Sequence, residues 1–118
     1  AETLNADYDF LEKQRDRYTG EIVTYEKHID VEGRDAVIID DIISTGKTAA
    51  NAVKILKKHG ARRVFVGASH ALLVGEAARL LNEAGVEEIA GTDSVMNKYA
   101  KVSVAPILVK KLKETQIL

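Results

Sequence analysis

The chain contains no cysteine and no tryptophan, and it has only one proline, one methionine and 5% aromatic residues. The lack of cysteine excludes a disulfide framework, a thiolate metal site and a catalytic thiol. No apolar run approaches the ~20 residues that a membrane-spanning helix needs, so we expect no membrane partner. No secretory signal is recognisable at the start of the sequence, and the expected location is the cytoplasm.

An excess of charge of one sign is also lacking. The 17 basic and 18 acidic residues give a formal net charge of −1. Without a basic field, binding to nucleic acid has little electrostatic support. At 118 residues, with 46% hydrophobic and 30% charged residues, the composition is typical of one globular domain.

The most informative segment is the run from Ala36 to Thr48, which reads AVIIDDIISTGKT. Its first four residues, Ala36–Ile39, are small or apolar and predict a strand buried on both faces, as in a parallel sheet. Asp40 and Asp41 follow where that strand should end. The loop Ser44–Thr48 is rich in hydroxyls and backbone donors, and an apolar helical pattern begins directly after it.

The order of strand, acidic pair, polar loop and helix suits one kind of ligand. Ligands of open α/β sheets bind outside the carboxyl ends of the strands, and helix N-termini attract phosphate. The two carboxylates can hold ribose hydroxyls, directly or through Mg²⁺, while the loop holds a phosphate. The pattern therefore predicts a site for a sugar phosphate.

This run resembles the phosphoribosyl pyrophosphate (PRPP) motif of type I phosphoribosyltransferases and of ribose-phosphate pyrophosphokinases. The resemblance implies that Asp40 and Asp41 contact the ribose 2- and 3-hydroxyls. It assigns the 5-phosphate to Ser44, Thr45, Gly46, Lys47 and Thr48. Two positions depart from the common pattern. Ser44 stands where many transferases have an acidic residue, which argues against a standard transferase, and Lys47 replaces a frequent small residue and adds a cation.

A dense charge run at residues 12–17 precedes the motif. An isolated run of this kind is usually a solvated loop. The pyrophosphokinases, however, carry a Lys-x-Arg at the start of a flexible loop upstream of the PRPP motif, and Lys13-Gln14-Arg15 resembles it in spacing and place. The resemblance implies that Lys13 and Arg15 are catalytic and stabilise the transferring diphosphoryl group from a mobile arm.

A small β-hairpin flap is expected around this arm, over about residues 13–30. Thr19-Gly20 predicts its turn and Glu21–Lys27 its second strand. A further short strand is expected at Tyr8–Leu11. His28 falls near the end of the flap and receives no role.

The remainder alternates strand and helix, which predicts one doubly wound α/β domain with a mostly parallel sheet over residues 1–118. Apolar periodicity predicts a helix whose buried stripe is Ala49, Ala52, Val53 and Leu56. The other predicted elements are strands at 64–68, 86–90 and 102–105, and helices at 75–84 and from Pro106 onward.

Two polar segments follow predicted strands on the ligand edge. They are Ser69-His70 and Thr92-Asp93-Ser94, and the family has similar residues at both places. His70 either faces the nucleotide or a neighbouring subunit, or is a loop histidine satisfied by backbone groups.

Three other interpretations of the central run were weighed. A P-loop needs a glycine where Asp41 stands. A phospho-accepting receiver domain needs another aspartate at a later strand end, and Asp93 is a poor candidate. A merely capped helix would use Ser44 or Thr45 as its N-cap, but it leaves the adjacent carboxylates unexplained.

The resemblance covers essentially the whole chain but only part of a pyrophosphokinase, which has two similar halves. It implies the C-terminal portion of an archaeal-like enzyme whose partners are ribose 5-phosphate, ATP and PRPP. Mg²⁺ would bind mainly through the substrate and the other half, and no metal ligand is assigned in this chain. A homo-oligomer is expected, and the chain alone is expected to be inactive. A type I phosphoribosyltransferase and a noncatalytic ribose-phosphate or nucleotide-binding domain remain open alternatives.

Overall fold

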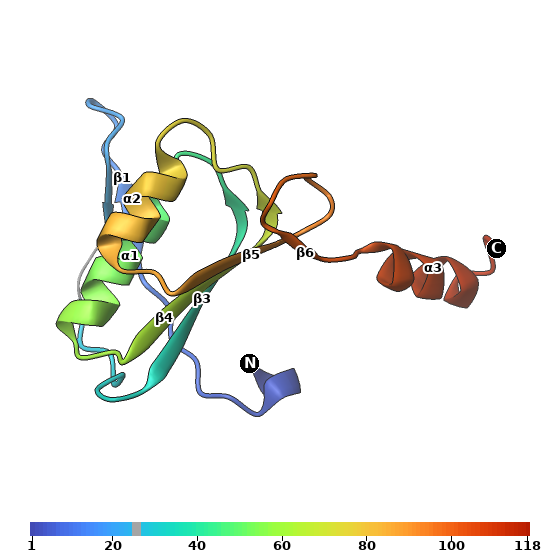
Figure 1. The fold of residues 1–118 in the computed structure, drawn as a ribbon, viewed down its shortest axis with the longest axis horizontal. Helices are drawn as coiled ribbons and strands as arrows, with labels where there is room; N and C mark the ends of the chain where they lie inside the picture. The colour runs from blue at the N-terminus through green and yellow to red at the C-terminus, as the bar shows by residue number, and fades with distance from the viewer. Residues whose placement is uncertain (25–26) are drawn as a thin grey trace.

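The computed structural model describes residues 1–24 and 27–118. A short 3₁₀ turn, Glu2–Leu4, precedes an antiparallel hairpin of β1 and β2, and a four-stranded parallel sheet follows in the order β3-β4-β5-β6. The elements are β1 Lys13–Arg15, β2 Ile22–Thr24, β3 Asp35–Ile43, α1 Lys47–Lys58, β4 Arg63–Ala71, α2 Ala77–Ala84, β5 Glu88–Thr92, β6 Ala100–Val102 and α3 Ala105–Glu114. The α/β class, the parallel sheet and the hairpin flap are thus confirmed (Figure 1).

The hydrophobic core lies between one face of the sheet and the helices α1 and α2, which both lie on that side (Figure 1). The stripe predicted for α1 is confirmed, because Ala49, Ala52, Val53 and Leu56 are all buried. Leu81 of α2 is completely buried opposite them. Burial of a Val or Leu side chain contributes about 1.5–3 kcal/mol, so this single layer supplies much of the stability.

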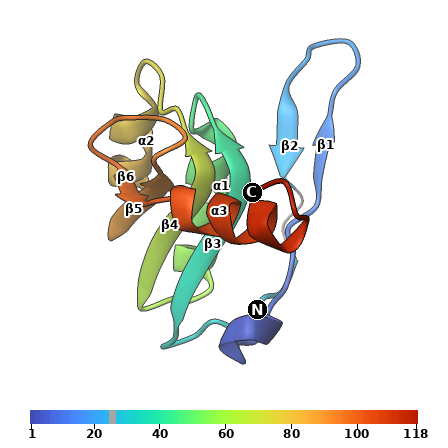
Figure 2. The ribbon, with the colours of Figure 1, turned by 90° about the vertical axis from the view of Figure 1, so that its right-hand side faces the viewer.

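The second face of the sheet is open, and the prediction that Ala36–Ile39 is buried on both faces is wrong. The side chains of Val37 and Ile39 are 63% and 76% exposed. Successive residues of a strand point to opposite faces, and these two point away from α1 and α2. Helix α3 does not cover them: it buries none of its residues and projects away from the sheet (Figures 1 and 2).

The projecting parts make the molecule extended. Its radius of gyration is 16.0 Å, whereas a compact domain of this length has about 13.5 Å. The hairpin β1–β2 and helix α3 both stand out from the sheet-and-helix body (Figure 2). Among the residues described, no helix has the length and apolar character needed to cross a membrane.

Three element predictions need correction. No strand forms at Tyr8–Leu11, where Asp9 instead pairs with Lys27 at 2.5 Å and Lys27 lies over the Phe10 ring. Strand β4 extends beyond the predicted 64–68, because its parallel pairing with β3 continues to Ile43↔Ala71. The strand predicted at 21–27 is described as β2 over Ile22–Thr24, residues 21 and 27 are not part of a strand, and residues 25 and 26 lie outside the described residues.

Glycine allows a close approach between β4 and β5. A Cβ atom at Gly91 would lie 2.6 Å from the Cβ of buried Ala71. At Gly67 the nearest atom would be the Cδ1 of exposed Ile39, at 2.9 Å. The first neighbour is fixed in the core, whereas the second is the end of a flexible side chain on the open face.

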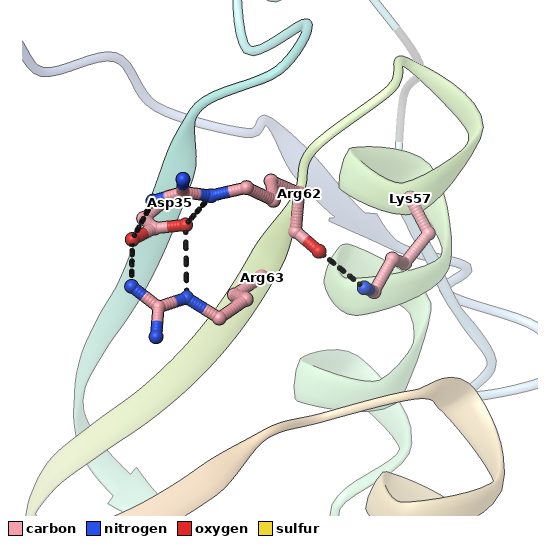
Figure 3. Close-up of polar contacts among 4 residues, drawn as sticks. All are labelled: Asp35, Lys57, Arg62 and Arg63. Atoms are coloured by element: carbon pink, nitrogen blue, oxygen red, sulfur yellow. Dashed lines mark hydrogen bonds and ion pairs between the residues drawn. The ribbon is translucent and has the colours of Figure 1, made fainter.

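The amino ends of β3 and β4 are joined by a cluster of ionic hydrogen bonds (Figure 3). The Asp35 carboxylate accepts from Arg62 Nε and Nη2, both at 2.8 Å, and from Arg63 Nε at 3.1 Å and Arg63 Nη2. Lys57 Nζ of α1 donates to the Arg62 carbonyl at 3.1 Å. Hydrogen bonds from Arg62, then Arg63, hold the pKa of Asp35 well below its ordinary value.

We expect Gly91→Ala to destabilise the fold by about 1–3 kcal/mol, the usual cost of overpacking a well-packed core. Gly67→Ala is the matched control, because Ile39 can swing into solvent, and it should cost clearly less. Urea unfolding followed by circular dichroism measures both. Equal losses in the two variants would contradict the close Gly91–Ala71 contact.

We expect Asp35→Asn to lower the thermal unfolding midpoint at neutral pH, because it removes the charge that both guanidinium groups bind. The folded pKa lies below the unfolded value of about 3.9. The contribution is therefore fully present above roughly pH 5 and is lost as pH falls below about 4 toward the folded pKa. The difference in midpoint between parent and variant should shrink over that range. Glu114→Gln, which removes an exposed α3 charge, is the control, and a difference independent of pH would contradict the assignment.

Candidate functional site

An open hollow of about 170 Å³ lies at the sheet edge where the parallel strands end. This is several times the ~30 Å³ share of one water molecule. Its lining is Lys13, Asp40, Ile42, Ile43, Ser44, Thr45, Gly46, Thr48 and Ala49. Six of the nine predicted site residues are in this set, whereas Arg15, Asp41 and Lys47 are not.

The loop between β3 and α1 is held in place by its backbone. The Ile43 carbonyl accepts from the N–H groups of Leu72 and Leu73, each at 3.0 Å, and the Ser44 carbonyl accepts from Val74 N–H at 3.0 Å. Gly46 has φ +78°, and a Cβ atom there would lie 3.1 Å from Ala77. Both the left-handed conformation and the close approach to α2 therefore require glycine.

Helix α1 begins with no side-chain cap. Its N-cap is Gly46, so the interpretation that Ser44 or Thr45 caps the helix is wrong. The first intrahelical donor is Ala50 N–H, bonded to the Gly46 carbonyl at 2.8 Å. Within the described part of the chain, the N–H groups of residues 44–49 have no backbone acceptor. A helix N-terminus with free N–H groups and positive dipole is a favourable place for an anion such as phosphate.

The acidic pair is divided between two environments. Asp40 is half-buried and lines the hollow, and its Oδ1 accepts from Asp41 N–H at 2.9 Å. Asp41 is exposed and accepts from Ile42 N–H at 2.8 Å. That N–H, the Asp40 side chain and the charge of Lys13 hold the pKa of Asp41 below its ordinary value. Asp40 therefore faces the hollow, whereas Asp41 alternates onto the open face.

The hairpin brings one of the two predicted catalytic cations to the hollow. Lys13 Nζ of β1 lies 3.9 Å from Asp40 Oδ2. Arg15 points elsewhere, since its Nε donates to the Gly20 carbonyl at 3.2 Å. Asp16 closes this turn by accepting from Tyr18 N–H and Thr19 N–H at 2.7 and 2.8 Å. The Arg15 side chain is thus part of the hairpin turn.

The chain offers little to a metal ion by itself. Among the described residues, no group of three or more His, Cys, Asp or Glu side chains could hold one. Mg²⁺ is usually held by one or two carboxylates together with substrate oxygens and water. Asp40, which lines the hollow, fits that limited contribution, and it is the side chain that would hold Mg²⁺ if it entered with a substrate.

A second polar group lies at the carboxyl ends of β4 and β5. The sequence left the role of its histidine, His70, open between a ligand-facing or subunit-facing residue and a loop residue satisfied by backbone groups. The group comprises Ser69 and His70 at the end of β4 and Thr92 and Ser94 at and after the end of β5. His70 Nδ1 lies 2.7 Å from Ser94 Oγ. The signal in the sequence was that polar residues follow two consecutive parallel strands, but the contact itself depends on the sheet register.

Comparisons of the sequence and of the structure with known proteins find relatives of the same kind. The profile of the phosphoribosyl synthetase-associated domain matches residues 23–117. A ribose-phosphate pyrophosphokinase of Saccharolobus solfataricus is 47% identical over 96 residues, covering 80% of this chain and 33% of that protein. Ribose-phosphate pyrophosphokinase 2 of Archaeoglobus fulgidus is 43% identical over 113 residues, covering 95% and 41%. The crystal structure of phosphoribosylpyrophosphate synthetase from Mycobacterium smegmatis matches with a TM-score of 0.63 and 30% identity, over 91% of this chain and 36% of that one.

The match to a solved structure agrees with the fold. The chain spans between a third and about two fifths of the length of the relatives named here. The matched profile covers most of the chain, including the hollow except for Lys13. The chain therefore belongs to the ribose-phosphate pyrophosphokinase family.

Proposed function

We propose that this chain binds ribose 5-phosphate at the hollow beside β3 and α1. As part of a longer protein, it would contribute to moving the diphosphoryl group of ATP to ribose 5-phosphate, giving PRPP and AMP. The observation that carries the proposal is the uncapped N-terminus of α1, whose free N–H groups open beside a carboxylate and three hydroxyl side chains.

The parts of the hollow suit the two ends of this substrate. A 5-phosphate on residues 44–48 would accept hydrogen bonds from the backbone N–H groups and from the hydroxyls of Ser44, Thr45 and Thr48. The Asp40 carboxylate accepts hydrogen bonds from ribose hydroxyls, or reaches them through Mg²⁺. Asp41 is the next residue of β3 and would also contact the ribose hydroxyls. Lys47 is exposed and adds positive charge near the phosphate.

The catalytic side of the proposal rests on Lys13 and Arg15. Lys13 already lies beside Asp40, and its ammonium would offset charge on the transferring phosphoryl oxygens. Arg15 would have to leave the Gly20 carbonyl before it could do the same. The proposal therefore requires the hairpin to change conformation during the reaction. Bound Mg²⁺ would neutralise phosphate charge and orient the diphosphoryl group.

Two other functions use the same hollow. A type I phosphoribosyltransferase would bind the same ribose phosphate and carry out a different reaction. A noncatalytic ribose-phosphate sensor would need the loop and Asp40 but neither cation. The position of Lys13 beside Asp40 favours the pyrophosphokinase over the sensor.

Self-association is also part of the proposal. Val37 and Ile39 on the open sheet face are 63% and 76% exposed, and Ile107 and Leu108 on α3 are 66% and 56% exposed. Contiguous exposed apolar side chains usually mark interaction surfaces. We expect them to be covered by other copies of the protein or by the remainder of a longer protein.

Ribose 5-phosphate should shift the backbone amide resonances of residues 44–48 in an NMR titration. Thr48→Val keeps the shape but removes a hydroxyl, and should weaken binding by roughly 1–3 kcal/mol.

Asp40→Asn should weaken binding more than Asp41→Asn, because Asp40 lines the hollow. Thr115→Val on α3 is the matched control. Shifts centred on Lys57 and Lys58 instead would refute the site.

The chain alone should release no AMP from ATP, ribose 5-phosphate and Mg²⁺, because the family resemblance assigns most ATP-binding residues to the half that is not represented here. Phosphoryl transfer depends mainly on positioning both substrates. Sedimentation of the same sample should show association that increases with concentration. Turnover near 1–100 s⁻¹, the usual range for kinases, would place the nucleotide site on this chain and contradict the prediction.

A further inference from the structure

Four polar groups form a closed hydrogen-bond network at the ends of β4 and β5. The Ser69 carbonyl lies 2.7 Å from Thr92 Oγ1 and 2.9 Å from Ser94 Oγ. Thr92 Oγ1 and Ser94 Oγ are 2.9 Å apart, and Ser94 N–H donates to Thr92 Oγ1 at 3.2 Å. His70 Nδ1 completes the network at 2.7 Å from Ser94 Oγ.

The number of hydroxyl hydrogens in this network indicates which ring nitrogen of His70 carries a hydrogen. A carbonyl only accepts, so the contact between Ser94 Oγ and the Ser69 carbonyl is a hydrogen bond only when Ser94 donates its single hydroxyl hydrogen. Ser94 Oγ then has no hydrogen left for His70, and His70 Nδ1 must be the donor. If Ser94 donated to His70 instead, its short contacts with Ser69 and Thr92 could not both be hydrogen bonds. The arrangement with the most hydrogen bonds is therefore the Nδ1–H tautomer.

In that tautomer the other ring nitrogen is a free acceptor. A neutral imidazole with Nδ1–H carries a lone pair on Nε2. His70 is exposed, and within the described residues Nε2 has no hydrogen-bond partner. An unprotonated nitrogen can accept from a hydroxyl but cannot donate to a phosphate. The chemistry of Nε2 thus fits a sugar hydroxyl.

The register places this acceptor next to the hollow. His70 is the parallel partner of Ile42, and neighbouring strands lie about 4.8 Å apart. Paired residues share a face of the sheet, and Ile42 lines the hollow together with Asp40. The loop after β5 is tied to the same strand end, since Asn97 Nδ2 donates to the Ala71 carbonyl at 2.7 Å. The network is therefore held at a fixed place beside the ribose site.

We propose that His70 is a positioning residue whose Nε2 accepts a hydrogen bond from a ribose hydroxyl, with Ser94 and Thr92 fixing the required tautomer. This inference rests on the proposed function, because it assumes that the sugar lies in the hollow beside Ile42. It extends the ribose site from β3 across the sheet edge to β4 and β5. Asp40 and His70 would then bind the same sugar from two neighbouring strands.

The test uses the whole chain at about pH 8. Imidazole ¹⁵N spectra of the parent report which ring nitrogen carries the hydrogen. Ribose 5-phosphate should move the Nε2 resonance of His70, whereas inorganic phosphate, which lacks a sugar, should leave it in place. This measurement needs no substitution and so does not depend on a variant folding.

Substitutions separate the two ring nitrogens. The side-chain amide of Asn can replace Nδ1 as the donor to Ser94 but places nothing at Nε2. His70→Asn should therefore weaken ribose 5-phosphate binding roughly two- to twelvefold, the loss of one hydrogen bond, and leave inorganic phosphate binding unchanged. Ser94→Ala should weaken sugar binding less and lose the Nδ1–H tautomer. His28→Asn, at an exposed histidine beside His59 at the end of α1, is the matched control.

The outcomes distinguish this inference from the proposed function. If the amides of residues 44–48 shift but His70 does not, and His70→Asn binds like the parent, the inference is overturned and the proposed function stands. An Nε2–H tautomer in the free chain overturns it as well. If neither the amides nor His70 respond to ribose 5-phosphate, both proposals fail.

Discussion

The parallel pairing of β3 with β4 is the constraint on which the rest of the structure depends. It runs from Asp35↔Arg63 to Ile43↔Ala71. Because both strands point the same way, their amino ends share the Asp35–Arg62–Arg63 cluster, and their carboxyl ends share the polar edge with the hollow. A parallel pair also needs a crossover, and α1 provides it. The loop between β3 and α1 is therefore part of the connection that the topology requires.

The same sheet leaves one face without cover. Helices α1 and α2 both lie on the side of Val53 and Leu81, and the face of Val37 and Ile39 is open (Figure 1). Parallel sheets normally have both faces covered. The chain spans between a third and about two fifths of its relatives' length, so a longer protein has enough residues to supply the missing layer. The position of the hollow does not depend on that layer, because its lining comes from β1, β3, the loop and α1.

Local patterns in the sequence were sufficient for most of the elements and for most of the hollow. The apolar run, the acidic pair and the Ser/Thr/Gly loop predicted β3, the ligand edge and the start of α1. Three features could not be predicted, because each depends on contacts distant in the sequence. Val37 and Ile39 are exposed because of where the helices pack, Arg15 turns toward Gly20 because of the hairpin, and His70 meets Ser94 because of the register of β4 and β5.

The candidate site combines a loop that is held by many contacts with a hairpin that is held by few. The loop 44–48 is held by β3, by the Leu72–Val74 amides and by the contact of Gly46 with Ala77. Lys13 and Arg15 lie on a two-stranded hairpin, and such a hairpin is at best marginally stable by itself. Fixed donors can bind a phosphate without reorganisation, which is what ground-state binding needs. Cations on a weakly supported hairpin can instead approach only when charge has to be neutralised during transfer. The division between the held loop and the weakly supported hairpin thus fits the proposed division between binding a substrate and acting on it.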